Sequence, residues 1–382
     1  MIYLDYQSTT PCDPAVVEAM LPFFSGQFGN PHSEDHAPGR LASRAIEEAR
    51  RSVASLIGAS PREIVFTSGA TEANNLAIKG AARYLAHQGS ARRRIVTVAT
   101  EHKCVLESVR DLAMEGFEPV ILPVGANGLV DPAALARALE SPTALVSIMS
   151  VNNETGVIQD IASLSHIVRE AGALFHTDAA QAAGRIPLDH DTVDLMSLSA
   201  HKIYGPKGVG ALYVRHRPRT RLVPLFSGGG QERGLRSGTL PTPLVAGFGV
   251  ACALARDHVQ SEGARLGRLR DCLAAGLVSG LPGLRVNGAG ADRVAGALNV
   301  MLPPGHAALD LIRAMPDVAV STGSACSSAE IAPSYVLTAM GIDAKDAARC
   351  LRLSVGRFTS EPEIVRALEL FLDAARRIHC PG

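Results

Sequence analysis

A lysine that follows an apolar run and precedes a glycine-rich turn is the most informative chemical feature of this sequence. Lys202 lies in the segment Ser199-Ala-His-Lys-Ile-Tyr-Gly-Pro-Lys-Gly-Val-Gly210, directly after residues 195–199, which have the composition of a buried strand. An amine held in such a place, rather than free in water, suits a Schiff base with an aldehyde cofactor. Taken alone, Lys202 is more simply explained as a surface lysine.

A carboxylate upstream supplies a second group that this chemistry needs. Asp178 lies in the segment His176-Thr-Asp-Ala-Ala-Gln181. In pyridoxal phosphate chemistry a lysine forms the Schiff base, and a carboxylate keeps the pyridine nitrogen protonated so that the ring can accept electrons. Lys202 and Asp178 together therefore predict a pyridoxal phosphate site, provided that other segments supply its remaining parts.

A third segment has the pattern of an anion site. Thr67-Ser-Gly-Ala-Thr-Glu-Ala-Asn74 follows a predicted strand and opens a predicted helix. Gly69 permits a tight turn, and the free amide groups of the first helical turn point at whatever occupies it. A capped helix start without a ligand explains this segment equally well. The segment is not a Walker motif and lacks the glycine spacing of a dinucleotide-binding turn.

Further polar residues follow other predicted strands. His102 comes just after residues 95–99, and Asn153 lies shortly after residues 144–149. An imidazole ring at such a position can stack on a flat heteroaromatic ring, although a lone histidine is more often structural. Because sites in open α/β sheets form at the carboxyl ends of the strands, several strand ends are expected to bring polar residues to one edge. These strand ends are at Thr67, Ala99, Val151, His176 and Ser199.

The elements that must position these groups alternate along the first half of the chain. Short apolar runs predict strands over residues 64–67, 95–99, 144–149, 174–176, 195–198 and 210–214. Helical spacing predicts helices over residues 16–24, 41–56, 74–87, 105–115 and 161–171. Such alternation is typical of a mainly parallel sheet with helices on both faces.

The length and type of the predicted elements change from about residue 243. Long helices are expected over residues 244–259 and 264–277, and a final helix over residues 361–378. Short strands are expected near residues 284–286 and 298–301. The length of 382 residues also favours a large domain plus a smaller one. The second half therefore predicts a separate α+β domain.

Composition excludes several classes of protein. The 37 basic and 37 acidic residues give zero formal net charge, which favours neither nucleic acid nor an anionic membrane as partner. No apolar run has the length of a membrane span, and the first residues lack the pattern of a signal peptide. Seven scattered cysteines without a CxxC pair argue against a disulfide framework or a structural zinc site, and for a reducing compartment.

One cysteine has unusual neighbours. Cys326 lies in Ser321-Thr-Gly-Ser-Ala-Cys-Ser-Ser328, among small and polar residues that favour a loop. A structural cysteine more often has apolar neighbours, as Cys252 has in Val250-Ala-Cys-Ala-Leu254. Cys326 is therefore the cysteine for which a chemical role is expected.

Nearly end to end, the sequence resembles the cysteine desulfurases of the NifS/IscS type, within the class V branch of fold-type I pyridoxal-phosphate enzymes. The motifs that match are Tyr3-Leu-Asp-Tyr6, Phe28-Gly-Asn-Pro31, Thr67-Ser-Gly-Ala-Thr-Glu72, Glu101-His-Lys103, Val151-Asn-Asn-Glu154, His201-Lys-Ile-Tyr-Gly-Pro-Lys207, Arg236-Ser-Gly-Thr-Leu-Pro241, Ser324-Ala-Cys326 and Leu353-Ser-Val-Gly-Arg-Phe358. The resemblance implies an α/β fold with two domains. The large one (residues 14–250) holds a mainly parallel seven-stranded sheet between helices, and the small α+β one (residues 1–13 and 251–382) carries the cysteine loop.

The resemblance also implies a role for each site residue. Lys202 binds the cofactor covalently and then moves protons, Asp178 pairs with the pyridine nitrogen, and Gln181 bonds to the ring hydroxyl. His102 stacks over the ring and acts in acid–base catalysis. The phosphate is expected to bind Ala70, Thr71, Ser199 and His201, with Thr239 reaching the phosphate of a neighbouring subunit. Asn153 contacts the cofactor and, with Arg357, binds the substrate carboxylate. Cys326 is the nucleophile that takes the sulfur, and no metal is expected.

The implied activity is removal of sulfur from L-cysteine, giving L-alanine and a persulfide on Cys326. The expected protein is a cytoplasmic homodimer that supplies sulfur to an acceptor protein, such as a scaffold for iron–sulfur cluster assembly. The long segment 327–335 fits the group that passes sulfur to partner proteins, whereas the ending at Gly382 favours a NifS-like or stand-alone role. Three alternatives stay open: a selenocysteine lyase, another class V aminotransferase or lyase, and a non-catalytic sulfur carrier.

Overall fold

The larger part of the molecule is built on a seven-stranded sheet. The computed structural model describes residues 1–323 and 333–379. The strands of the sheet are β2 (Ile64–Thr67), β3 (Arg94–Val98), β4 (Glu118–Leu122), β5 (Thr143–Ser147), β6 (Leu174–Asp178), β7 (Leu195–Ser199) and β8 (Gly210–Val214). They lie in the order β2-β8-β7-β6-β5-β3-β4. Only β8 is antiparallel to its neighbours in this sheet, so the predicted fold class is confirmed.

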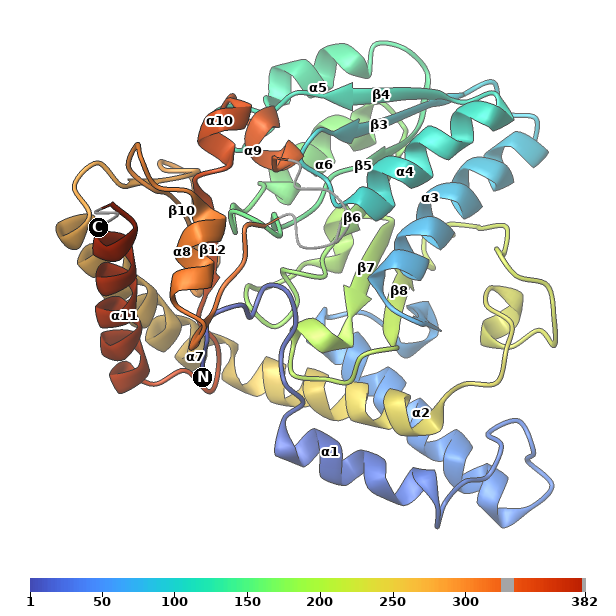
Figure 1. Cartoon of the computed structure of the whole chain (residues 1–382). Helices are drawn as coiled ribbons and strands as arrows, with labels where there is room; N and C mark the ends of the chain where they lie inside the picture. The colour runs from blue at the N-terminus through green and yellow to red at the C-terminus, as the bar shows by residue number, and fades with distance from the viewer. Residues whose placement is uncertain (324–332, 380–382) are drawn as a thin grey trace.

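Helices cover both faces of this sheet because its strands are apolar on both sides (Figure 1). Val65 and Ile95 pack on one face against α3 (Ala70–His87) and α4 (Lys103–Asp111). The adjacent residues of the same strands point to the opposite face. The helices that supply the core there are α2 (Ala37–Leu56), α5 (Pro132–Ala138), α6 (Ile161–Glu170) and the first part of α7 (Thr242–Gly280), with α1 (Pro14–Met20) packed beside α2 and α7.

The smaller part of the molecule has its own core. Its antiparallel sheet has the order β12-β10-β9, and a two-stranded parallel sheet pairs β1 (Ile2–Tyr3) with β11 (Val318–Ala319). The remaining elements are β9 (Arg285–Val286), β10 (Ala297–Met301), β12 (Cys350–Ser354), α8 (Ala308–Ala314), α9 (Tyr335–Ala339), α10 (Ala344–Ala347) and α11 (Glu361–His379). Figure 1 shows this part in orange and red, beside the N-terminal strand.

A single long helix joins the two cores, in contrast to the two helices predicted over residues 244–259 and 264–277. α7 runs for 39 residues, and no proline interrupts it after its first turn. Gly263 has open space where a β-carbon would lie, so it marks no close contact that would end the helix. Phe248 packs in the larger core and Leu273 in the smaller one. The predicted domain boundary at residue 250 therefore falls inside α7.

Several elements escaped the sequence prediction, among them β4, α5 and β12. β4 contains a glutamate and a proline and lies at the edge of the sheet, where half-exposed residues do not form an apolar run. α5 has only seven residues, too few for a clear period. β12 contains Arg352 at its centre, which interrupts its apolar pattern. In the ranges that the structure describes, no helix combines the length and the apolar character of a membrane span.

Candidate active site

A cavity of about 630 Å³ lies at the carboxyl ends of the parallel strands. This space, called the main cavity below, has a volume typical of a cofactor site. All the predicted cofactor residues except Thr239 line it: Ala70, Thr71, His102, Asn153, Asp178, Gln181, Ser199, His201 and Lys202. These residues follow five different strands, so the predicted convergence at one sheet edge is confirmed. The sequence prediction did not include other lining residues, among them Gln7, Cys104, Lys207 and Arg352.

Lys202 is held at the end of a short 3₁₀ turn (Ala200–Lys202) that directly follows β7. Its Nζ donates hydrogen bonds to the carbonyl oxygens of Gln7 (2.8 Å) and Ser8 (2.7 Å). The N-terminal segment therefore crosses the cavity and fixes the amine against it. A β-carbon on Gly205 would lie 2.9 Å from the carbonyl oxygen of Ala200, which explains why the turn after the lysine requires glycine.

Asp178 presents a carboxylate at the end of β6. One of its oxygens accepts a hydrogen bond from Asn74 Nδ2 (2.7 Å) and the other from the backbone of Ala180 (2.9 Å). Asn74 is fully buried on α3 and was not predicted as a site residue. The neighbouring carboxyl group of Glu101 is also fully buried, and burial together with the charge of Asp178 raises its pKa well above the usual value. Two hydrogen bonds thus fix the Asp178 carboxylate at this end of the cavity.

His102 caps the start of α4 and is oriented by the same turn. Its Nδ1 accepts a hydrogen bond from the backbone N–H of Cys104 (3.2 Å) and lies 3.0 Å from the Cys104 sulfur. Because Nδ1 is an acceptor, the proton of the neutral ring lies on Nε2. Asn74 Nδ2 also lies 3.1 Å from the Cys104 sulfur. One hydrogen-bonded chain thus connects Asp178 to His102.

The opposite end of the main cavity suits an anion. Ala70 and Thr71 begin α3, and the first amides of a helix have no partner within the helix. Lys207 also lines this region. His201 Nδ1 lies 3.1 Å from Thr9 Oγ1, and burial, with the charges of Lys202 and Lys207, lowers the pKa of His201 to about 4. His201 is therefore neutral at pH 7, and the positive charge comes from the lysine and the helix terminus.

Several polar atoms beside the main cavity are buried without a partner among the described residues. They include both amide atoms of Gln7, Oδ1 of Asn153 and Nε of Arg352. Buried polar groups are normally hydrogen-bonded, so orphaned atoms that line a cavity indicate a polar ligand. An anion site, a carboxylate for a ring nitrogen and a held amine are the groups that pyridoxal phosphate requires. The residues present fit this cofactor.

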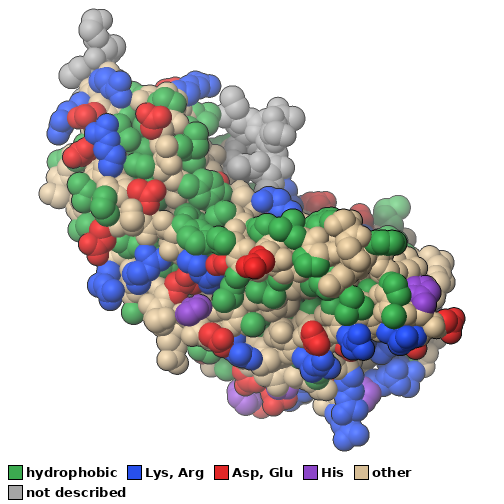
Figure 2. Space-filling view, turned by 90° about the horizontal axis from the view of Figure 1, so that it is seen from below, with side chains coloured by type: hydrophobic (Ala, Val, Ile, Leu, Met, Phe, Trp, Pro, Cys, Tyr) green, Lys and Arg blue, Asp and Glu red, His purple; other side chains and the backbone are tan. Residues whose placement is uncertain are grey.

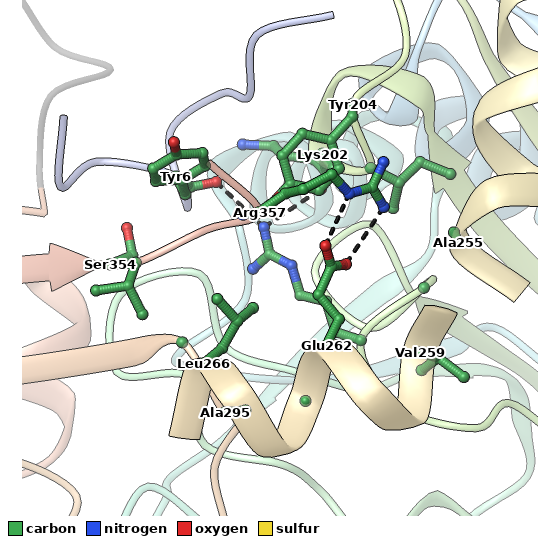
Figure 3. A pocket seen from close by; sticks show the side chains of 16 residues that line it. Tyr6, Lys202, Tyr204, Ala255, Val259, Glu262, Leu266, Ala295, Ser354 and Arg357 are labelled. Atoms are coloured by element: carbon green, nitrogen blue, oxygen red, sulfur yellow. Dashed lines mark hydrogen bonds and ion pairs between the residues drawn. The ribbon is translucent and has the colours of Figure 1, made fainter. Parts of the chain in front are cut away.

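Arg357 lies outside the main cavity, so its predicted place in the substrate site has to be corrected. It lines a separate space of about 40 Å³, the Arg357 cavity, shown in Figure 3. Its guanidinium pairs with Glu262 (2.7 Å) and Asp13 (2.9 Å) and stacks 4.2 Å from the ring centre of Tyr204. Burial alone would lower the pKa of Arg357, but these carboxylates raise it. Its charge is thus already neutralised within the chain.

Arg352, five positions earlier, is the arginine that reaches the main cavity. It donates to the carbonyl oxygen of Asn153 (3.0 Å) and to Asp5 (2.9 Å), while its Nε has no partner among the described residues. An arginine inside the apolar strand β12 was the sequence signal that could have identified it.

The remaining predicted residues are Thr239 and Cys326. Thr239 is exposed and does not line the main cavity of its own chain. Cys326 lies outside the described residues. Of its neighbours in sequence, Gly323 lines the main cavity.

Comparisons with known proteins agree with this geometry. The family model described as aminotransferase class-V matches residues 2–367. The chain is 48% identical over 379 residues to a cysteine desulfurase IscS of Rickettsia bellii, covering 99% of this chain and 92% of that protein. It is 49% identical to a human cysteine desulfurase, covering 99% of this chain and 82% of that protein.

Solved structures show the same architecture. A NifS-like protein superposes with a TM-score of 0.90 at 34% identity, covering 98% of this chain and 99% of that one. A structure described as SspA in complex with cysteine superposes with a TM-score of 0.83 at 37% identity, covering 94% of this chain and all of that one (100%).

Proposed function

Because the chain belongs to the class-V aminotransferase family and, within it, to the cysteine desulfurases, we propose that Cys326 accepts the sulfur removed from L-cysteine. The enzyme is pyridoxal-phosphate-dependent and converts L-cysteine to L-alanine. The observation that carries the proposal is the main cavity, where Lys202, Asp178 and the anion site of α3 surround one space, with Gly323 on its wall.

Pyridoxal phosphate, when bound, supplies an aldehyde that condenses with amines and a protonated ring that accepts the electron pair freed at an amino acid's α-carbon. Lys202 would hold the cofactor through its amine, and the same amine would move a proton at the substrate α-carbon. Asp178 would stabilise the proton on the ring nitrogen, and Asn74 and Ala180 keep its carboxylate in place. His102 would lie against the ring, with its Nδ1 fixed by the backbone N–H of Cys104.

The substrate carboxylate is proposed to bind Arg352 in place of Arg357. An arginine forms two parallel hydrogen bonds with a carboxylate, and Nε is one of the donors that such a pair uses. The unpartnered Nε of Arg352 and the unpartnered Oδ1 of Asn153 border the same cavity. These atoms support a substrate site that is formed by both residues.

The sulfur transfer requires a thiolate at position 326, since a neutral thiol is a poor nucleophile. The Cys326 sulfur attacks the substrate sulfur, a sulfur–sulfur bond forms, and the substrate's carbon–sulfur bond breaks. The electron pair of the broken bond stays with carbon, which is then protonated. The balance is L-cysteine plus enzyme thiol giving L-alanine plus enzyme persulfide, without an external oxidant or reductant.

A second copy of the chain is proposed to complete the site through Thr239. Thr239 is exposed in the single chain, where it has no phosphate to bind. Leu21, Phe24 and Phe28 are 59%, 61% and 77% exposed, more than a monomer's surface normally leaves uncovered in one short segment. Figure 2 shows apolar side chains exposed between charged ones on the lower face. Sedimentation of the cofactor-loaded enzyme as a monomer would contradict this part of the proposal.

The persulfide is proposed to pass to an acceptor protein in the cytoplasm, such as an iron–sulfur scaffold. The name IscS among the relatives supports this route.

The role of Cys326 is tested by Cys326→Ser in the cofactor-loaded enzyme, with L-cysteine and L-selenocysteine as substrates. We expect loss of alanine formation from L-cysteine while cofactor binding is retained. Unchanged turnover of L-cysteine would favour a lyase that does not use this thiol. Turnover of selenocysteine alone by the wild type would favour the selenocysteine lyase.

A further inference from the structure

Glu154 is a buried carboxyl group to which the mechanism above gives no role. Its backbone N–H donates to Asn152 Oδ1 (2.9 Å), and its carbonyl oxygen accepts from Asn299 Nδ2 of β10 (3.1 Å). The residue is only 2% exposed. Its main chain is thus fixed between the two parts of the molecule, which leaves the side chain in one place beside the main cavity.

One carboxyl oxygen of Glu154 contacts both flanks of the segment 324–332, called the Cys326 segment below. On the far flank, Ser334 Oγ donates to Glu154 Oε2 at 2.5 Å. On the near flank, a β-carbon at Gly323 would lie 2.5 Å from the same oxygen, so only glycine allows this approach. Gly323 also has φ of +90°, which glycine adopts without strain.

The contact with Ser334 is stronger than an ordinary hydroxyl bond. Distances of about 2.5–2.7 Å are typical of a hydroxyl that donates to a charged carboxylate. Burial raises the pKa of Glu154, and the Ser334 hydroxyl and the nearby charge of Arg352 oppose that rise. Ser334 Oγ also accepts the backbone N–H of Leu337 and so caps α9. Glu154 therefore connects the near flank to a helix.

We propose that Glu154 is a positioning residue for sulfur transfer, because its carboxyl group joins the two flanks of the Cys326 segment beside the substrate site. The inference rests on the proposed role of Cys326. Because Gly323 and Ser334, on either side of Cys326 in the sequence, both lie against one Glu154 oxygen, loss of this carboxyl group is expected to slow sulfur transfer to Cys326. Glu154 acts through these flanks and does not touch the reacting atoms.

The test is single-turnover reaction of the cofactor-loaded enzyme with L-cysteine in Glu154→Ala and Ser334→Ala. Two quantities are measured: the change in cofactor absorption when cysteine binds, and the rate at which Cys326 gains a persulfide. We expect wild-type substrate binding and a persulfide rate lower by about 10- to 100-fold. The double variant is expected to be no slower than Glu154→Ala, since both changes remove one contact.

Two controls separate this contact from general effects on α9. Thr338→Val removes an exposed hydroxyl that bonds to the Ser334 carbonyl oxygen (3.0 Å) on the same helix, and its rate should stay within about twofold of wild type. Ser334→Asp keeps a good helix cap but places a second carboxylate against Glu154. It should be as slow as Ser334→Ala.

The outcomes distinguish the proposed role of Cys326 from the positioning role of Glu154. If wild-type enzyme forms no persulfide on Cys326, the proposed function fails, whatever the variants do. If the wild type forms it and Glu154→Ala and Ser334→Ala form it equally fast, the positioning role is overturned. Recovery of the wild-type rate in Ser334→Asp would also overturn it, because the loss would then come from the helix cap. Should Glu154→Ala fail to fold, the two Ser334 variants decide the question.

Discussion

Lys202 lines two neighbouring cavities, which differ in whether their polar groups have partners within the chain. In the Arg357 cavity of about 40 Å³, the guanidinium is paired with Glu262 and Asp13. In the main cavity of about 630 Å³, atoms of Gln7, Asn153 and Arg352 are buried without a partner among the described residues. Groups that stabilise the fold are saturated by the chain, whereas groups that bind a ligand are left for it.

The two arginines make this contrast most clearly, because they lie five positions apart. Arg352 belongs to β12 and faces the main cavity, whereas Arg357 follows that strand and lies over Tyr204. Residue type and nearness in sequence therefore do not distinguish an arginine that lines the main cavity from one that is paired outside it. The hydrogen-bond and ion-pair partners of each guanidinium group make this distinction.

The largest effect is expected for Lys202→Ala, since this change removes the amine that the main cavity holds. The variant should lose the absorption band of covalently attached cofactor, and kcat should fall by about 10³-fold or more, because a proton-transfer group is also lost. Absorption spectra and alanine assays measure the two effects. Retention of the band would mean that another amine binds the cofactor.

The contrast between the arginines predicts opposite results for Arg352→Gln and Arg357→Gln. Arg352→Gln should raise KM for L-cysteine by about 10- to 100-fold, the value of one charge-assisted hydrogen bond. Arg357→Gln should leave KM nearly unchanged but reduce the free energy of unfolding by about 2 kcal/mol, because two partly buried carboxylates lose their charged hydrogen-bond partner. Steady-state kinetics and denaturant unfolding measure the two effects. A reversed pattern would restore Arg357 as the substrate residue.

A smaller loss is expected for Asn74→Leu. This side chain donates to Asp178 at 2.7 Å from a fully buried position, and leucine has the same branch at the γ-carbon without the donor. Asp178 would lose one of the two hydrogen bonds that orient its carboxylate, so kcat should fall by about tenfold with little change in KM. A fall in kcat that is fully accounted for by a smaller fraction of folded enzyme would indicate a purely structural role.

The smallest effect on activity is expected at His176, which is buried between Ser147 and Ser197 and does not line the main cavity. Burial lowers the pKa of His176 to about 3. Between pH 6.5 and 3 the unfolded chain binds the proton and the folded chain does not, so stability falls as pH falls. This group should reduce the free energy of unfolding by about 2 kcal/mol between pH 7 and pH 5.

Urea unfolding at several pH values measures this contribution. His176→Asn should have a weaker dependence of stability on pH in that range, with kcat within about twofold of wild type. An unchanged dependence would mean that His176 carries no part of it.

The sequence predicted which groups share the main cavity, because these groups lie in short motifs at strand ends. Lys202, Asp178 and His102 each follow an apolar run, and parallel strands deliver such residues to one edge. Asn74 could not be predicted as the partner of Asp178, since 104 positions separate them and only the packing of α3 brings them together. Arg352 was missed because a motif directed attention to Arg357. The unbroken α7 was predicted as two helices, although no proline interrupts it after its first turn and Gly263 lies in open space.

The destination of the sulfur atom tests the proposed function most directly. Cofactor-loaded wild-type enzyme should be mixed with one equivalent of L-cysteine, and the products assayed for alanine and mapped for persulfide by mass spectrometry. The account predicts equal amounts of L-alanine and of persulfide on Cys326. Suppose that alanine forms in full, without an acceptor present, and Cys326 stays an unmodified thiol. That result would contradict the proposed role of Cys326.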